Sequence, residues 1–381
     1  MMSCVMLLTP ALQRFDWGSA DAIPDLLGLE PDGEPYAEAW WGAHPVAPST
    51  TAAGPLDEVI AADPVSTLGA SCERTHGRLP YLLKVLAIAR PLSIQVHPTL
   101  ERAREGFALE QAAGIAINDP HRTYKDASHK PEMLLALSDV TVLSGFREAD
   151  AVAADLRAIG GEDAQALAQL IDEHGIHGYV DAVLTESHPD AVAHLSQARD
   201  GISASATVAR GALSIHPDDP GALVALAMNA VTLQPGETLF TPSGVVHCYI
   251  SGLCVELMAN SDNVVRAGFT HKPVNADLLR ELALLEHTEP LVPRTRVDGA
   301  ARVLSTDADE FELTVVENGH ATCAGGPRIV VALDGVTRVS TAGEDLALEA
   351  GAAAFIPAAD GAAALDVTGL AVVASVSSRS H

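Results

Sequence analysis

The pattern of apolar and polar positions divides the chain into three successive parts. In residues 1–147, short apolar runs alternate with Gly and Pro, and two of them, 92–96 and 133–146, have the length and residue types of strands. Apolar residues then recur at helical spacing among Ala, Asp, Glu and Gln in residues 148–230. From residue 231 onward the runs are short, strand-like and separated by Gly and Asp. The pattern predicts mainly β-structure with a helical unit inserted between its strands.

These parts predict three domains, because a chain of 381 residues exceeds the usual limit for one hydrophobic core. Residues 1–147 and 231–287 are expected to form one discontinuous β-barrel, and residues 148–230 an inserted helical domain. Residues 288–381 are expected to form a C-terminal β-domain. Breaks such as Gly160-Gly161 divide the helical part into helices of ordinary length.

Composition restricts the classes of partner. Apolar residues make up 48% of the chain and charged residues 19%, which is enough apolar material for substantial cores and argues against disorder. The net charge of −27, from 23 basic and 50 acidic side chains, makes nucleic acid and anionic membranes poor partners. No apolar run reaches the roughly 18 residues of a membrane-spanning helix. An anionic small substrate would require a local cluster of Lys and Arg.

The cysteine content favours a cytoplasmic location. The 5 cysteines are odd in number and form no C-x-x-C pair, which is typical of reduced thiols. Residues 1–10 are apolar but lack a basic leader and a small-residue cleavage pattern, so we do not interpret them as a signal peptide. A monomer or weak homodimer is expected.

A metal-binding motif spans Gly236 to His247. Its spacing, G-x5-P-x-G-x2-H, matches the second metal-binding motif of the cupin barrel. Pro242 and Gly244 suit a turn between two strands, and His247 then begins the returning strand with its imidazole directed inward. The Asn that often closes this motif is replaced by Ser251.

Two further ligands are expected two residues apart on another strand, since positions i and i+2 face the same side. Gln95 and His97 have this spacing, and Glu132 opens the next strand-like run as the carboxylate. A lone His, Gln or Glu is more often structural than a ligand. The combination of Gln95, His97, Glu132 and His247 nevertheless predicts one divalent metal ion, with zinc as the expected cofactor.

Several blocks of sequence extend this evidence. They lie at residues 17–19, 38–45, 79–86, 91–98, 124–126, 129–133 and 256–268. On these blocks the chain resembles the type I mannose-6-phosphate isomerases (phosphomannose isomerases), with the blocks in family order over most of residues 14–273. One departure is visible at residues 39–42, which read Ala-Trp-Trp-Gly where the family often has Leu-Trp-Met-Gly. Residues 148–230 and the C-terminal hundred share only architecture with the family.

The resemblance implies a zinc-dependent aldose–ketose isomerase. Such an enzyme interconverts mannose 6-phosphate and fructose 6-phosphate through an enediolate, so a phosphorylated hexose is the expected partner. The implied fold is mainly β, with two cupin (jelly-roll) barrels, one metal-binding and one degenerate, and an inserted α-helical unit. The family's ligands fall on the four residues already chosen by spacing. The resemblance also implicates Arg266.

Arg266 suits the stabilisation of the enediolate oxyanion, because a guanidinium is permanently charged and forked. The base that moves the proton is left open. Glu256 and Asp262 are favoured, while His129 and Lys130 adjoin a metal ligand. The alternative for the two carboxylates is an ion-pair role that orients Arg266.

Phosphate recognition requires the local basic cluster. Lys84 stands in an apolar run, where an unpaired charge is costly, so we expect it to have a functional partner. Lys272 has the ordinary solvated lysine as its alternative. Trp17 and Tyr249 are expected to line the pocket, with aromatic core packing as the alternative. The candidate substrate-binding residues are Ser93, Lys84, Lys272, Glu38, Trp17 and Tyr249.

A metal-dependent oxygenase and a non-enzymatic sugar-binding cupin are the alternative functions. Oxygenases of this fold usually offer several His ligands, so Gln95 argues against redox chemistry. A binding module needs no arginine and carboxylate beside the metal. Gly351 and Pro357 repeat the G-x5-P spacing, but the Gly and His that follow it in the earlier motif are missing. The C-terminal barrel is therefore expected to hold no metal.

Overall fold

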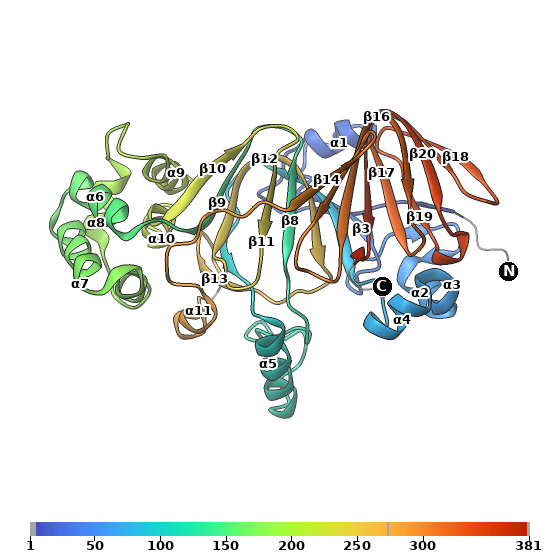
Figure 1. Ribbon diagram of the computed structural model, residues 1–381. Coiled ribbons are helices and arrows are strands. Elements are labelled where there is room, and N and C mark those ends of the chain that lie inside the picture. The colour runs from blue at the N-terminus through green and yellow to red at the C-terminus, as the bar shows by residue number, and fades with distance from the viewer. Residues whose placement is uncertain (1–4, 273, 379–381) are drawn as a thin grey trace.

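The computed structural model describes residues 5–272 and 274–378, and it is mainly β with antiparallel sheets (Figure 1). A 10-stranded sheet occupies the middle of the view and an 8-stranded sheet its right side, while helices project to the left. The expectation of mainly β-structure with inserted helices is confirmed. Within the described residues, no helix combines the length and apolar character needed to cross a bilayer.

The 10-stranded sheet is organised around β12 (His247–Ala259), which pairs with four other strands along its length. Strand β12 is long enough to begin beside β7 and to end beside β8, where Met258 lies opposite Glu132. The remaining strands of this sheet are β2 (Ala11–Gln13), β3 (Glu38–Gly42), β6 (Tyr81–Ile88), β7 (Ile94–Val96), β8 (Glu132–Ala136), β9 (Val140–Phe146), β10 (Met228–Leu233), β11 (Thr238–Thr241) and β13 (Val265–Gly268).

The 8-stranded sheet is formed mostly by the end of the chain. Its strands are β1 (Met6–Leu8), β14 (Arg294–Asp298), β15 (Ala301–Ser305), β16 (Glu312–Cys323), β17 (Arg328–Ser340), β18 (Asp345–Glu349), β19 (Ala353–Ile356) and β20 (Ala363–Ser375). Strand β1 comes from the opposite end of the sequence and pairs with β19, with Met6 opposite Phe355. The apolar pattern gave no indication of this pairing.

Helices connect β9 to β10. They are α6 (Ala149–Ile159), α7 (Glu162–Thr185), α8 (Pro189–Ser196), α9 (Ala204–Leu213) and α10 (Gly221–Leu226). Helix α7 contains a break at Gly175, which adopts a φ of 64°. Apolar faces of these helices, including Leu156 and Tyr179, pack with Phe146 of β9 and Val265 of β13 in one core. The helical unit is therefore anchored on the 10-stranded sheet.

Shorter elements complete the structure. They are α1 (Ala22–Leu27), β4 (Thr50–Thr51), β5 (Gly54–Pro55), α2 (Leu56–Ala62), α3 (Pro64–Leu68), α4 (Ala70–His76), α5 (Leu100–Ala112), α11 (Ala276–Leu282) and a 3-10 turn, Ala358–Asp360. Cys72, Cys248, Cys254 and Cys323 are free thiols, whereas Cys4 lies outside the described residues.

The two large sheets share a core. Trp41 and Leu83 of the first sheet pack in one cluster with Ile329 and Phe355 of the second. Tyr81 crosses this interface, because its phenol oxygen lies 3.1 Å from the carbonyl oxygen of Pro327 and 3.0 Å from that of Ala374. A buried hydroxyl from the first sheet thus satisfies backbone acceptors of the second.

We predict that Tyr81→Phe lowers the free energy of unfolding by about 1–2 kcal/mol, because it leaves buried carbonyls without their donor. Urea titration followed by circular dichroism measures this change. Tyr124→Phe is the matched control, since the Tyr124 phenol is also shielded but makes no hydrogen bond to a described residue. Equal losses in the two variants would contradict the prediction.

Candidate functional site

Three strands bring a cluster of potential metal ligands together. His97 follows the end of β7, while Glu132 and His247 are the first residues of β8 and β12. The turn before β12 is built as the motif predicted, with Gly244 at a φ of 84°. The Gly244 backbone N–H donates to the carbonyl oxygen of His97 at 2.9 Å, which joins the two halves of the site.

The side chains of these three residues are buried and mutually close. Glu132 Oε1 lies 3.2 Å from Nε2 of His97, and Glu132 Oε2 lies 3.2 Å from Nε2 of His247. One ligand atom from each residue falls within 4.8 Å of the others. Among the described residues, this is the group of His, Cys, Asp and Glu side chains with the spacing of a metal site.

The protonation of the imidazoles favours metal binding. Nδ1 of His97 lies 2.7 Å from the carbonyl oxygen of Asn263, and Nδ1 of His247 lies 3.1 Å from that of Val245. A carbonyl can only accept, so each Nδ1 carries a proton and Nε2 is the ring nitrogen available to a metal. Burial, reinforced by the charge of Lys130, lowers the pKa of His97 to about 4, so its ring is neutral near pH 7.

The residues present fit a divalent cation. Within the described part of the chain, the buried Nε2 of His97 has no hydrogen-bond partner, although a carboxylate oxygen faces it. The lone pair of His97 Nε2 and the anionic oxygen of Glu132 repel each other unless a cation lies between them, so this arrangement favours a bound cation. Gln95 lines a small cavity together with Glu132 and His247. Its amide N–H donates to Ser93 Oγ at 3.0 Å, which leaves the amide oxygen as a possible fourth ligand.

Two neighbours hold the carboxylate of Glu132. Lys130 Nζ lies 2.8 Å from Oε1, and the Tyr249 hydroxyl donates to Oε2 at 3.1 Å. Burial alone would raise the pKa of Glu132, but the charge of Lys130 holds it well below its usual range. Burial raises the pKa of Tyr249, which keeps this phenol a neutral donor. Glu132 is thus an anion at all ordinary pH values.

A second charged group lies in the same cavity. Lys84 Nζ is 3.1 Å from Glu256 and 3.3 Å from Glu38, and it lies 4.9 Å from the centre of the Trp40 ring. Burial would lower the pKa of Lys84, but Glu38 and Glu256 raise it above its ordinary value. Burial raises the pKa of Glu256 despite the opposing charge of Lys84. The partner expected for Lys84 is therefore a pair of carboxylates.

A larger cavity is linked to this one through the pairing of β13 with β7, where Arg266 of its lining lies opposite Gln95 of the small cavity. The small cavity has a volume of about 80 Å³, whereas the neighbouring one has about 1090 Å³ and is lined by Asp262, Arg266, Lys272 and His44. Asp262 Oδ1 is 3.4 Å from His44 Nε2. Burial would raise the pKa of Asp262, but His44 and the charges of Lys130 and Lys84 lower it. Asp262 is therefore within electrostatic reach of the small cavity.

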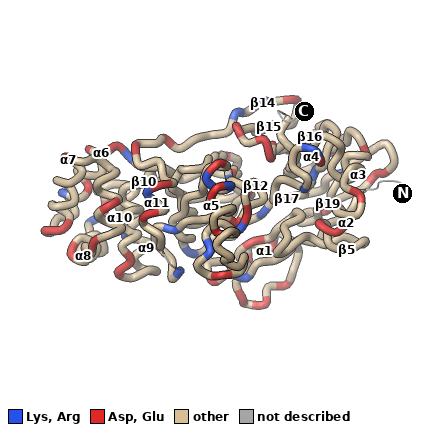
Figure 2. The backbone as a smooth tube through the Cα atoms, turned by 90° about the horizontal axis from the view of Figure 1, so that it is seen from below, with Lys and Arg blue, Asp and Glu red and all other residues tan. Residues whose placement is uncertain are grey.

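Two cations in the larger cavity influence each other. The charge of Arg266, followed by burial, lowers the pKa of Lys272, and burial lowers the pKa of Arg266. Neither side chain forms an ion pair with a described residue. Asp and Glu residues occur along all parts of the chain, as Figure 2 shows. This pair forms the local basic cluster that an anionic substrate requires.

Most of the sequence-predicted residues meet at the two cavities. The small cavity is lined by Glu38, Lys84, Ser93, Gln95, Lys130, Glu132, His247, Tyr249 and Glu256. His97, His129 and Trp17 line neither cavity, although His97 contacts Glu132 of the small one. His129 Nε2 instead lies 2.7 Å from Glu310 Oε1, and Trp17 stacks on Phe15 with ring centroids 5.9 Å apart.

Sequence reasoning did not single out His44, Asp126 or Asn263 as site residues. The Asp126 carboxylate accepts from the Ser261 hydroxyl at 2.9 Å and from the backbone N–H of Asp262 at 2.9 Å. The Asn263 amide donates to the carbonyl oxygens of Asp126 and Ser128, each at 2.8 Å. All three residues stand in the blocks that carry the family resemblance. The sequence blocks therefore contained these residues, but they did not indicate which side chains contact one another.

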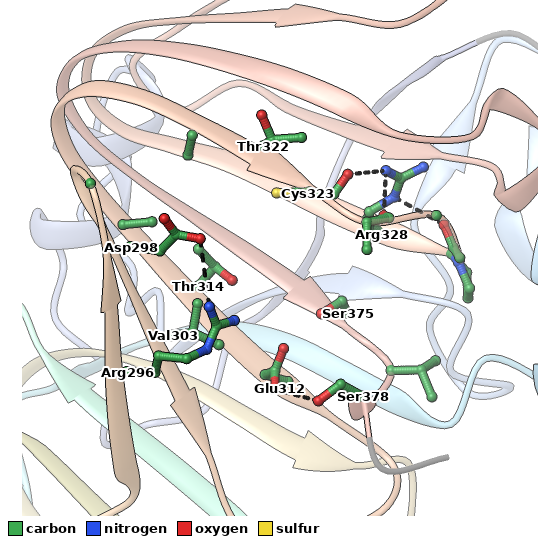
Figure 3. Close-up of a pocket in the computed structure, with 18 of the residues that line it drawn as sticks. Arg296, Asp298, Val303, Glu312, Thr314, Thr322, Cys323, Arg328, Ser375 and Ser378 are labelled. Carbon is green, nitrogen blue, oxygen red and sulfur yellow. Dashed lines mark hydrogen bonds and ion pairs between the residues drawn. The ribbon is translucent and has the colours of Figure 1, made fainter. Parts of the chain in front are cut away.

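Another cavity, of about 410 Å³, lies in the 8-stranded sheet (Figure 3). Its charged groups are largely engaged with the protein itself. The Arg328 guanidinium donates to backbone carbonyls, among them that of Ala324 at 2.8 Å, while Arg296 pairs with Asp298 at 3.5 Å. Ser378 donates to Glu312 at 3.2 Å. This cavity offers no grouping comparable with the His97–Glu132–His247 cluster.

We predict that His247→Ala lowers the affinity for zinc by more than about 100-fold. That loss exceeds the 10–100-fold typical of removing only an outer partner of a ligand. Competition against a chromogenic chelator measures the affinity, and elemental analysis measures the zinc content. His194→Ala, which alters an exposed histidine paired only with Asp190, is the control. Unchanged zinc binding in His247→Ala would refute the assignment.

The Glu310–His129 contact predicts a pH dependence of stability. Burial would raise the pKa of Glu310, but the hydrogen bond and charge of His129 lower it. A carboxyl whose pKa is depressed by folding stabilises the protein above its unfolded pKa of about 4.3, and this contribution disappears as the pH falls. Glu310→Gln should therefore be less stable than the parent near pH 7, with the difference shrinking below about pH 4.

Urea midpoints measured across this range check the prediction. Glu349→Gln removes the same charge at an exposed position of β18 and should show no such trend. A difference for Glu310→Gln that stays constant down to acid pH would contradict the depressed pKa.

Known proteins share these features. Residues 5–149 match the family model of the type I phosphomannose isomerase catalytic domain. The mannose-6-phosphate isomerase of Escherichia coli (strain K12) is 37% identical over 281 residues, which cover 70% of this chain and 72% of that protein. The human mannose-6-phosphate isomerase is 32% identical over 317 residues, covering 73% of this chain and 72% of the human protein.

The similarity extends to the three-dimensional structure. The crystal structure of mannose 6-phosphate isomerase from Salmonella typhimurium, bound to its substrate fructose 6-phosphate and to zinc, superposes with a TM-score of 0.90. It is 29% identical in sequence, and the alignment covers 98% of this chain and 99% of that one. Together with the sequence identity to the bacterial and human enzymes, this agreement shows that the chain belongs to the type I phosphomannose isomerase family.

Proposed function

We propose that this protein is a zinc-dependent isomerase that interconverts mannose 6-phosphate and fructose 6-phosphate. The observation that carries the proposal is the buried His97–Glu132–His247 cluster, which lies next to a cavity containing Arg266 and Lys272. The side chains of these two cations form neither an ion pair nor a hydrogen bond with a described residue. The relatives named for this activity, and the one bound to fructose 6-phosphate and zinc, support the same assignment.

His97, His247 and Glu132 would hold the zinc ion, with the Gln95 amide oxygen as the fourth ligand. A zinc ion with these ligands keeps net positive charge, and when bound it supplies a Lewis acid for a carbonyl or alkoxide oxygen of the sugar. The uncharged Gln95 leaves more of this charge than a second carboxylate would. Gln95 in place of a further His also argues against redox chemistry at this site.

We assign the sugar phosphate to the larger cavity. A cavity of about 80 Å³ is too small for a hexose phosphate, whereas the neighbouring one of about 1090 Å³ accommodates it. Arg266 and Lys272 would bind the phosphate or the developing oxyanion, since both are cations without a counter-charge in the described chain. Lys84 is less suited to phosphate, because Glu38 and Glu256 already neutralise it.

Asp262 is the favoured group for proton transfer, because it lines the cavity that fits the substrate. Its carboxylate would take the proton from C2 of the aldose, and the electron pair of that bond would form the C1–C2 double bond of an enediolate. Return of the proton to C1, with movement of the O2 hydroxyl proton to O1, gives the ketose. Lys130 and Arg266 would stabilise the negative oxygen during this exchange.

Glu256 is the second candidate base. Its raised pKa suits acid–base work near neutral pH, but Lys84 lies 3.1 Å away and holds the carboxylate. In this position Glu256 serves mainly to keep the buried Lys84 paired. The His129 ring contacts Glu310 and lines neither cavity. His129 would therefore influence the reaction only through the backbone position of its neighbour Lys130.

For the architecture we propose two cupin barrels. The 10-stranded sheet would form the metal-binding barrel from residues 1–147 and 231–287, with residues 148–230 as the helical insertion. The 8-stranded sheet would form the degenerate barrel from residues 288–381, to which β1 adds one strand. A monomer or weak homodimer and a cytoplasmic location stay predictions.

We predict that the purified protein forms fructose 6-phosphate from mannose 6-phosphate in a coupled assay, and that chelation abolishes this activity. Arg266→Ala should retain zinc while losing more than about 100-fold in kcat, because it removes a charge acting on the oxyanion. Arg199→Ala, at an exposed site in the helical unit, is the control. Activity that survives complete zinc removal, or stoichiometric iron with oxygen consumption, would refute the proposal.

A further inference from the structure

An unusual backbone conformation stands directly after the strand that carries Arg266. Phe269, the residue following β13, has a φ of 53°. In the described chain, Asp218 and Asn318 are the other residues besides glycine with positive φ. A bulky side chain rarely adopts this region, and such strain persists only where the surroundings enforce it. The turn lies between Arg266 and Lys272, which both line the larger cavity.

One carboxylate holds this turn. The backbone N–H of Phe269 donates to Asp219 Oδ2 at 2.9 Å, and the backbone N–H of Gly221 donates to Asp219 Oδ1 at 2.8 Å. Asp219 therefore bridges the end of β13 and the start of α10. Charge-assisted hydrogen bonds of this kind are stronger than those between neutral groups.

Further contacts join the helical unit to the same turn. A Cβ added to Gly268 would lie 2.4 Å from the Cα of Gly221, so the two backbones touch without side chains between them. The Phe269 ring is buried and stacks on His216, with ring centroids 5.4 Å apart and an interplanar angle of 21°. His216, Asp219 and Gly221 thus all contact the turn at Gly268 and Phe269.

The direction of the chain at Phe269 determines how Lys272 is placed relative to Arg266. These two side chains repel each other, as the lowered pKa of Lys272 beside Arg266 indicates. Like charges separate unless the backbone holds them together. The contacts of Asp219, His216 and Gly221 with the turn at Phe269 keep the backbone in place between the two cations. These three residues belong to the helical unit, which contributes no residue to the metal cluster.

We propose that Asp219 is a positioning residue for phosphate recognition, because it fixes the turn at Phe269 that presents Arg266 and Lys272 together to the phosphate of the substrate. This inference rests on the proposed function. It gives the helical unit a role in the preference for phosphorylated over unphosphorylated sugars.

Steady-state kinetics with mannose 6-phosphate tests the proposal. Asp219→Asn loses one of the two acceptor oxygens, and Asp219→Ala loses both. Each should raise KM about fivefold or more, because the strained turn at Phe269 relaxes and Lys272 moves away from the phosphate. The change in kcat should be small, since the pairing of β13 with β7 keeps Arg266 opposite Gln95. The inhibition constant of inorganic phosphate should rise in parallel, while zinc content stays at the parent level.

Asp218→Asn is the matched control. It removes the same charge from the neighbouring residue, and Asn tolerates the positive φ of that position. Loss of a negative charge by itself strengthens the attraction for phosphate, so this variant should show an unchanged or lower KM. The two Asn variants are therefore expected to differ in the sign of their effect.

A KM for Asp219→Asn within twofold of that for Asp218→Asn would overturn the proposal, as would a loss confined to kcat or to the melting temperature. If Asp219→Ala does not fold, Asp219→Asn carries the test, because it keeps the side-chain volume. If the parent protein does not isomerise the sugar, the proposed function fails separately. Calorimetric titration with inorganic phosphate then still compares the variants, and equal affinities would overturn the inference.

Discussion

The carboxylate of Glu132 between two imidazole nitrogens is the constraint on which the rest of the site depends. Glu132 is 3% exposed, and an isolated buried anion would be very unfavourable. Lys130 and Tyr249 compensate part of this charge, and a metal ion held by His97 and His247 would compensate the rest. The site is thus an electrostatic unit in which each ligand requires the others. Such a unit explains why the ligands come from three different strands whose relative register is fixed.

The length of β12 makes this unit possible. Its first residue, His247, lies opposite Gln95 of β7, and its later residue Glu256 lies opposite Lys84 of β6. One continuous strand therefore positions a metal ligand and a buried ion pair at a fixed separation. A one-residue slip would turn each side chain to the other face, so the register of β12 controls both groups at once.

The large negative charge of the chain gives the few unpaired cations their importance. Most basic side chains near the site are already engaged: Lys84 with two glutamates, Lys130 with Glu132, and Arg78 with a backbone carbonyl and Ser128. Arg266 and Lys272 differ from these. Their charges act on whatever occupies the larger cavity, and this arrangement concentrates the attraction for an anion at one place.

The sequence by itself predicted the candidate metal ligands and determined the order of the structural parts. Spacing was enough to propose Gln95 and His97, because alternation along a strand is a local rule, and His247, because a Pro-x-Gly turn is built locally. Apolar periodicity likewise located the helical unit. The tertiary structure alone decided the partners: Glu256 with Lys84, His129 with Glu310, β1 with β19, and Asp219 with the turn at Phe269. These contacts join residues far apart in the chain, and which of them form depends on how the sheets and helices pack, a property that no local pattern encodes.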